Sequence, residues 1–232
     1  MRCSLRLLCA FCLLTCATPM AGESPEGAVD PESLLPPTLA WDGTSRSLIA
    51  EADDPWRTPA EASGFQTTPD YETTIAWVER LVEASPRLHK VSLGESLEGR
   101  PIWMVIATAE GAATPGELHA NGRPILLAHA GIHSGEIDGK DAGLMFLREL
   151  TVGESLGDLL GQASFLFVPI LNVDGHERRS AYNRINQRGP EEMGWRTNAA
   201  NLNLNRDFAK LDTPEIRALV QAIDRWQPDL YI

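Results

Sequence analysis

The sequence predicts an α/β domain with a mixed, largely parallel twisted sheet flanked by helices. Short apolar runs of strand length alternate along the chain with longer segments in which apolar residues recur at helical spacing. No internal repeat interrupts this alternation. The chain has 232 residues, of which 43% are hydrophobic, so it is long enough and apolar enough to bury one ordinary core.

Helical signals occur in three segments, which are residues 70–84, 138–150 and 214–226. In the first, the apolar residues share one helical face, and Ser85-Pro86 ends the helix. The third has Thr213 as its cap and Pro214 in its first turn, the positions that these residue types favour.

Strand signals occur at Leu88–Leu93, Pro101–Thr108, Pro124–Ala130, Ser164–Leu171 and Asp229–Ile232. The turn-rich residues 94–100 join the first two of these strands. The third and fourth are nearly continuous apolar runs, which is typical of strands buried on both faces of a sheet.

Charge excludes two classes of partner. The chain carries 32 acidic and 20 basic side chains, a formal net charge of −12, and no run of Lys or Arg. Binding to nucleic acid or to an anionic membrane begins with basic side chains that neutralise phosphates. We therefore expect a partner that is small or cationic, or one whose binding does not depend on net charge, with no nucleic-acid partner and no stable membrane insertion.

The first residues have the layout of a secretory signal peptide. Arg2 and Arg6 precede a short apolar run over residues 7–17, which is too short to span a bilayer. All four cysteines lie in this leader, and lipid attachment at Cys16 is the alternative to cleavage. We expect a secreted or periplasmic protein whose metal sites, if any, use His and carboxylate ligands.

Three regions follow from these patterns. Residues 1–21 are the predicted signal peptide, and residues 22–69 are a Pro-rich, acidic extension or linker with scattered apolar side chains. Residues 70–232 contain the alternating strands and helices, and form the predicted domain.

Candidate metal ligands follow the third predicted strand. His133 and Glu136 are spaced i, i+3 at the start of a helix, so an imidazole nitrogen and a carboxylate can converge on one side of a turn. Such a pair supplies two ligands of the kind found in catalytic zinc sites. The alternative is a solvated loop whose carboxylate interacts with the helix dipole. His129 lies in the strand itself, where a packed, hydrogen-bonded histidine is favoured over a ligand.

A second candidate site lies in residues 201–208, where Leu and Asn alternate as in an extended stretch. Asn205 and Arg206 place an amide next to a guanidinium, which suits a two-point grip on a carboxylate. The alternative is an Asn-rich turn with a structural Arg–Asp contact. The long polar loop over residues 177–196 precedes it, and long loops at a sheet edge tend to be functional.

Four ordered motifs resemble those of zinc metallocarboxypeptidases of the carboxypeptidase A type. These are Gly94-Glu95-Ser96-Leu97-Glu98-Gly99-Arg100-Pro101, Gly131-Ile132-His133-Ser134-Gly135-Glu136, Asn172-Val173-Asp174-Gly175 and Asn203-Leu204-Asn205-Arg206-Asp207-Phe208. The resemblance covers residues 71–232, and implies a zinc carboxypeptidase-like fold that is incomplete at the C-terminus.

The resemblance also implies roles for single residues. His133 and Glu136 are two of three Zn²⁺ ligands, and Asn205 and Arg206 bind the terminal carboxylate of a peptide substrate. Arg184 or Arg188 is the arginine that steadies the scissile carbonyl oxygen. Gly135 stands where the family usually has a further arginine between the two ligands.

Two groups that the family requires have no counterpart here. The third ligand, a histidine, and the catalytic glutamate would lie beyond Ile232, and none of His89, His119, His129 or His176 occupies the matching position. We therefore expect a zinc-dependent carboxypeptidase domain that hydrolyses C-terminal residues, here as a fragment that is inactive on its own. A metal-dependent amidase on the same scaffold and an inactive domain that binds carboxylates or peptides are the alternatives.

Overall fold

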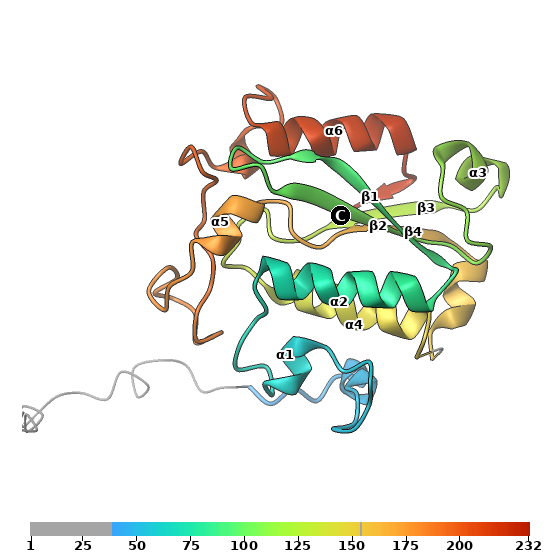
Figure 1. Ribbon diagram of the computed structural model, residues 1–232, viewed down its shortest axis with the longest axis horizontal. Helices are drawn as coiled ribbons and strands as arrows, with labels where there is room; N and C mark the ends of the chain where they lie inside the picture. The colour runs from blue at the N-terminus through green and yellow to red at the C-terminus, as the bar shows by residue number, and fades with distance from the viewer. Residues whose placement is uncertain (1–38, 154) are drawn as a thin grey trace, which may run out of the picture. The chain divides into compact units, whose positions relative to one another are not determined.

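The computed structural model describes residues 39–153 and 155–232 (Figure 1), so the predicted signal peptide lies outside the described residues. The chain divides into two units, residues 1–42 and 43–232. All helices and strands described below belong to the second unit.

The sheet of the second unit has five strands in the order β1-β2-β4-β3-β5. They are β1 Leu88–Glu95, β2 Pro101–Ala107, β3 Ile125–His129, β4 Ser164–Val168 and β5 Leu230–Tyr231. β2 pairs antiparallel with β1 and with β4, whereas β3 pairs parallel with β4 and with β5. The predicted mixed sheet flanked by helices is therefore confirmed, with β2 running against the other four strands.

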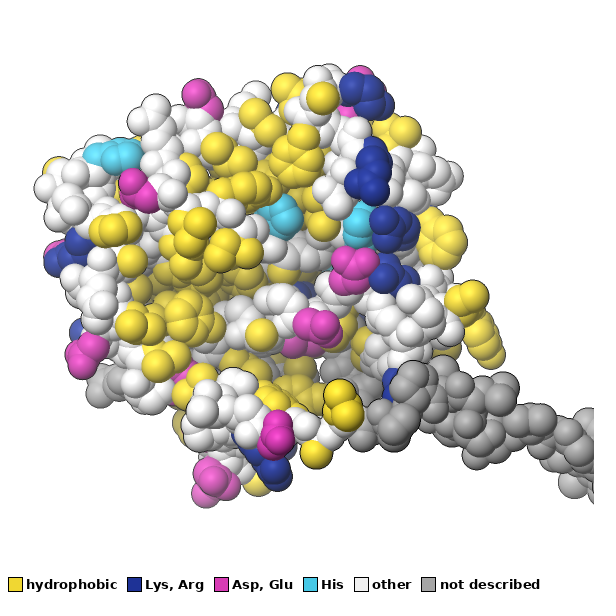
Figure 2. Space-filling model, turned by 180° about the vertical axis from the view of Figure 1, so that it is seen from behind, with side chains coloured by type: hydrophobic (Ala, Val, Ile, Leu, Met, Phe, Trp, Pro, Cys, Tyr) yellow, Lys and Arg dark blue, Asp and Glu magenta, His cyan; other side chains and the backbone are white. Residues whose placement is uncertain are grey.

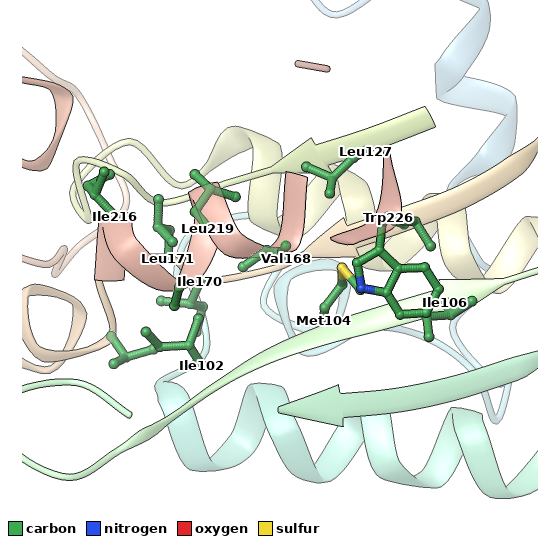
Figure 3. Close-up of a cluster of buried hydrophobic side chains, with 14 of the residues drawn as sticks. Ile102, Met104, Ile106, Leu127, Val168, Ile170, Leu171, Ile216, Leu219 and Trp226 are labelled. Atoms are coloured by element: carbon green, nitrogen blue, oxygen red, sulfur yellow. The ribbon is translucent and has the colours of Figure 1, made fainter. Parts of the chain in front are cut away.

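Helices cover both faces of this sheet. α2 (Tyr71–Ala84) and α4 (Asp138–Leu150) lie along one face, and α6 (Pro214–Trp226) lies along the other (Figure 1). Side chains alternate along β2, so that Met104 packs in the cluster under α6 (Figure 3) and Val105 packs in the cluster under α2 and α4. In the described part of the chain, no helix is long and apolar enough to cross a membrane.

The predicted helices match the structure closely. α4 and α6 have the predicted bounds, and α2 begins one residue later because Asp70 caps it with a 2.7 Å bond from the N–H of Thr73. β4 ends three residues before the predicted strand does, because the N–H of Leu171 turns to the carbonyl oxygen of Ala130.

Short helices were not predicted. They are η2 Thr44–Leu48, α1 Pro59–Ala62, α3 Pro115–Ala120, η3 Gly157–Gly161, α5 Val173–Glu177 and η4 Leu204–Arg206. α1 and α3 both begin with a Thr-Pro pair followed by Glu, and both form a complete capping box. A few residues suffice for a capped turn, which is too short for a hydrophobic period to be visible.

The segment that precedes α2 is fixed to α4 by a buried ion pair. Arg148 and Glu61 are each 1% exposed, and their Nη1 and Oε2 atoms lie 2.6 Å apart. Glu61 also accepts the backbone N–H groups of Ala50 (2.9 Å) and Thr58 (2.7 Å). Arg148 also donates to the carbonyl oxygen of Leu48. Backbone groups of residues that precede α1 thus help to satisfy the charges of this pair.

A second buried network joins α2, α4 and α5. The ammonium of Lys140, in the first turn of α4, donates to the carbonyl oxygen of Pro69 (2.6 Å) and to Nε2 of His176 (3.1 Å). Because an ammonium can only donate, His176 carries its proton on Nδ1, which donates to Glu177 (2.7 Å). Glu177 also accepts the N–H of Tyr71 at the start of α2 (2.9 Å). Burial lowers the pKa of Lys140 to about 8 and that of His176 to about 4.

We expect Arg148→Met to destabilise the domain by about 3–5 kcal/mol, because it leaves the Glu61 carboxylate buried without its charged partner. The double variant Glu61→Gln/Arg148→Met should recover much of this loss. Urea unfolding of both variants and of Glu61→Gln completes a double-mutant cycle. If the changes in the free energy of unfolding of the two single variants add up to that of the double variant, Glu61 and Arg148 are not coupled and the prediction is wrong.

We expect acid to destabilise the fold through His176. Burial lowers its pKa from an ordinary value of 6.5 to about 4, so the unfolded chain takes up the proton first as the pH falls. The stabilisation is complete above pH 6.5 and is lost between pH 6.5 and about 4, by up to about 3 kcal/mol. Urea unfolding across this pH window should show that the free energy of unfolding falls less for His176→Gln than for the parent protein. Parallel curves of this free energy against pH for variant and parent would count against the prediction.

Candidate metal and carboxylate site

The candidate site lies at the carboxyl ends of β3 and β4, where ligands bind in open α/β sheets. Both strands continue into loops that pair with each other: the N–H of Ala130 donates to Val168 (2.9 Å), and the N–H of Asn172 donates to Gly131 (3.1 Å). The loop after β3 carries His133 and Glu136 and lines a cavity of about 240 Å³.

The two predicted ligands lie together. His133 is 5% exposed, and its Nδ1 lies 3.3 Å from Oε2 of Glu136, whose side chain is 46% exposed. A buried imidazole thus faces a carboxylate that reaches solvent. The structure brings these residues into contact, as the i, i+3 spacing predicts.

Asn203 fixes the orientation of this imidazole. Its Oδ1 lies 3.0 Å from Nε2 of His133 and also accepts the N–H of Asn205 (3.1 Å), which identifies the oxygen side of the amide. Nε2 of His133 must then carry the proton, and Nδ1 presents its lone pair toward Glu136. A partner of this kind behind a histidine is typical of metal ligands.

Two arginines contact the other carboxylate oxygen of Glu136. Nη2 of Arg184 donates to Oε1 (2.8 Å), and Nη1 of Arg196 lies 3.7 Å from the same atom. Burial acts to raise the pKa of Glu136, but the hydrogen bond from Arg184 opposes this effect, and the pKa is lowered. Glu136 therefore stays ionised, as a metal ligand must be.

The donor atoms fit two positions of a zinc site. Two ligands of one tetrahedral zinc ion lie roughly 3.4 Å apart, given bonds of about 2.1 Å. The 3.3 Å between Nδ1 of His133 and Oε2 of Glu136 agrees with this spacing. Within residues 39–153 and 155–232, no group of three or more His, Cys, Asp or Glu side chains is placed to hold a metal ion.

The missing side chain at Gly135 makes room for Arg184. A Cβ at position 135 would lie 2.7 Å from Cγ of Arg184 and 2.9 Å from the carbonyl oxygen of Gly194. A side chain here would force Arg184 or the backbone at Gly194 to shift. The guanidinium that reaches the ligand pair thus comes from the long loop over residues 177–196, and not from between the ligands.

Asn205 and Arg206 lie in η4, so the predicted extended stretch is wrong. Asn203 caps this short helix, and this turns the chain before a strand can form. Leu204 is fully buried, whereas Asn205 and Arg206 are exposed next to the capping residue that holds His133. Nη1 of Arg206 donates to the carbonyl oxygen of Asn205 (2.7 Å).

The structure also joins two of the sequence motifs. Asp174 is fully buried, and it accepts from the hydroxyl of Ser96 (2.7 Å), the N–H of Glu98 (3.1 Å) and Nη1 of Arg100 (2.8 Å). These hydrogen bonds attach the turn between β1 and β2 to α5. These motif residues support the loops and do not face the ligand pair.

His129 lines the same cavity as His133. Its Nδ1 is buried without a hydrogen-bond partner, and burial lowers its pKa. Its ring packs edge-to-face on Tyr231, with centroids 5.5 Å apart.

Sequence reasoning missed Arg196 and the role of Asn203. Arg196 ends the long polar loop and carries no distinguishing neighbour, while Arg188 of the same loop is exposed. Asn203 stands 70 residues from His133, so only the folded chain brings them together. Figure 2 shows Lys and Arg side chains gathered along one edge of the molecule, beside a histidine and an acidic side chain.

Relatives with known structures share this fold. Carboxypeptidase A from Helicoverpa armigera superposes with a TM-score of 0.57 and 19% sequence identity, over 72% of this chain and 45% of that one. A putative carboxypeptidase from Burkholderia mallei gives a TM-score of 0.53 and 23% identity, over 69% and 38% of the two chains.

Sequence relatives point to the same family. Human carboxypeptidase D is 31% identical over 164 residues, which are 58% of this chain and 12% of that protein. Carboxypeptidase D from Drosophila melanogaster is 27% identical over 207 residues, or 81% and 14%. The chain thus spans about an eighth of the length of these relatives. The sequence pattern of the zinc carboxypeptidases matches residues 74–232, and the chain therefore belongs to the zinc carboxypeptidase family.

Proposed function

We propose that this chain is part of a zinc-dependent metallocarboxypeptidase, which hydrolyses C-terminal residues from peptides. The observation that carries the proposal is the pair of His133 and Glu136, 3.3 Å apart, with Asn203 holding the imidazole so that Nδ1 presents its lone pair. Zinc bound there would polarise the scissile carbonyl and make water a nucleophile near neutral pH.

Residues around the ligand pair have separate roles in the proposed reaction. Asn203 keeps the proton of His133 on Nε2, and Arg184 holds one oxygen of Glu136 while the other faces Nδ1. Arg196, 41% exposed at the side chain, is free to reach outward to the scissile carbonyl oxygen. We prefer Arg196 for this role over Arg184, which is 16% exposed and clamped on Glu136.

Substrate alignment falls to Asn205 and Arg206. Both are exposed, and the guanidinium forms a fork suited to a carboxylate. A terminal carboxylate held there presents only the last peptide bond to the metal. The described residues place no third His, Cys, Asp or Glu side chain with His133 and Glu136 to complete a metal site. We propose that the 232 residues alone bind zinc weakly and do not turn over substrate.

We also propose that the protein is exported. The support is the basic start and the short apolar run in residues 1–17, which together resemble a cleavable leader.

Loss of Asn203 should weaken metal binding without removing a ligand. We expect Asn203→Leu to lower zinc affinity by about 10- to 100-fold, because the imidazole loses the partner that sets its tautomer. His133→Ala should remove measurable binding. Calorimetric zinc titration of the 232-residue chain, with urea unfolding to verify the fold of each variant, measures both effects. Unchanged affinity in His133→Ala would reject the site.

Arg206 should select peptides with a free C-terminus. We expect Arg206→Ala to weaken binding of a free-acid peptide by at least about tenfold and to leave its C-terminal amide unaffected, since only the carboxylate engages the fork. Fluorescence anisotropy with the two labelled peptides measures the preference. Arg225→Ala, at the far end of α6, is the matched control. A preference for the free acid that survives in Arg206→Ala would contradict the assignment.

A further inference from the structure

The segment that carries the arginines of the candidate site has a charge opposite to that of the chain as a whole. Residues 178–206 contain six arginines and two glutamates, although the chain has a net charge of −12. This segment forms the loops that carry Arg184, Arg196 and Arg206. A local field of this sign attracts anions and repels cations.

Two of the six guanidiniums are held by structural contacts. Arg178 donates to the carbonyl oxygen of Ala199 (3.1 Å) and lies 3.4 Å from Glu98. Arg179 donates to the carbonyl oxygen of Thr68 (2.8 Å) and lies 4.0 Å from Glu192. These two arginines therefore fasten the loop to its surroundings.

The arginines next to the ligand pair outnumber their carboxylate partners. Arg184 and Arg196 share the single carboxylate of Glu136, at 2.8 Å and 3.7 Å. Nη1 of Arg184 is buried without a hydrogen-bond partner. In the proposed function, Glu136 binds a metal cation and Arg206 binds the terminal carboxylate of the substrate. The positive charges of Arg184 and Arg196 then remain unbalanced, because the terminal carboxylate of the substrate binds at Arg206.

We infer that the preferred substrates are acidic: peptides, or acylated amino acids, with one or more carboxylates in addition to the terminal one. This inference rests on the proposed function and names its substrate class. The positive charge of Arg184 and Arg196 attracts an additional carboxylate nearby, while Arg196 still contacts the scissile carbonyl oxygen.

The test uses four labelled peptides of one length, with either two Glu or two Gln before the last residue, and with a free or an amidated C-terminus. We expect the Glu peptide with a free C-terminus to bind the 232-residue chain roughly tenfold more tightly than its Gln counterpart at low salt. The difference should shrink at high salt, where screening acts over a few ångströms. Anisotropy titrations measure all four affinities.

Variants locate the effect. Arg184→Gln/Arg196→Gln should abolish the preference for Glu peptides, and Arg196→Gln alone should reduce it if the double variant does not fold. Arg225→Gln removes the same charge at the far end of α6 and should leave the preference intact. Equal affinity for Glu and Gln peptides at low salt, or a preference lost equally in the Arg225 control, would overturn the inference.

The two proposals fail separately. If amidation has no effect while the Glu preference persists, the carboxylate site at Asn205 and Arg206 is wrong and the acidic preference stands. If amidation weakens binding while Glu and Gln peptides bind alike, the site stands and the acidic substrate class is wrong.

Discussion

The candidate site depends on the close approach of three backbone segments at Gly194. A Cβ at this position would lie 2.8 Å from each of three atoms: the carbonyl oxygen of Gly175, Cα of His176 and Cβ of Ser134. Real Cβ atoms do not approach so closely, so the segment around Gly194 packs against the loops after β3 and β4 only because residue 194 has no side chain. The N–H of Trp195 then donates to Gly175 (2.7 Å), and this seals the contact. Arg184 and Arg196 flank this point, and so reach Glu136 together.

Buried polar groups hold these loops in place. Lys140 and His176 connect the start of α4 with α5, and Arg148 and Glu61 connect α4 with the segment before α2. Such contacts are costly to desolvate, but removing one partner costs more than the pair itself gains. The helix that follows Glu136 is therefore fixed at both of its ends. This suits a site in which two donor atoms must keep a defined separation.

Much of the fold follows from local patterns, and the site follows only in part. The helical periods of α4 and α6 give their bounds, and His133 and Glu136 are close because they are near in sequence. The partnership of Asn203 with His133 joins residues 70 positions apart, which no local pattern encodes. The alternating Leu and Asn around Asn203 favour a strand, but the Asn side chain caps its own backbone and forms a turn.

Asn203 belongs to both halves of the site at once. The same side-chain oxygen accepts from Nε2 of His133 (3.0 Å) and from the N–H of Asn205 (3.1 Å), which precedes Arg206. A shift of η4 that tightens the grip on one group must therefore move the hydrogen bond behind the imidazole. If a metal and a peptide both bind there, each would change the affinity for the other by the same factor.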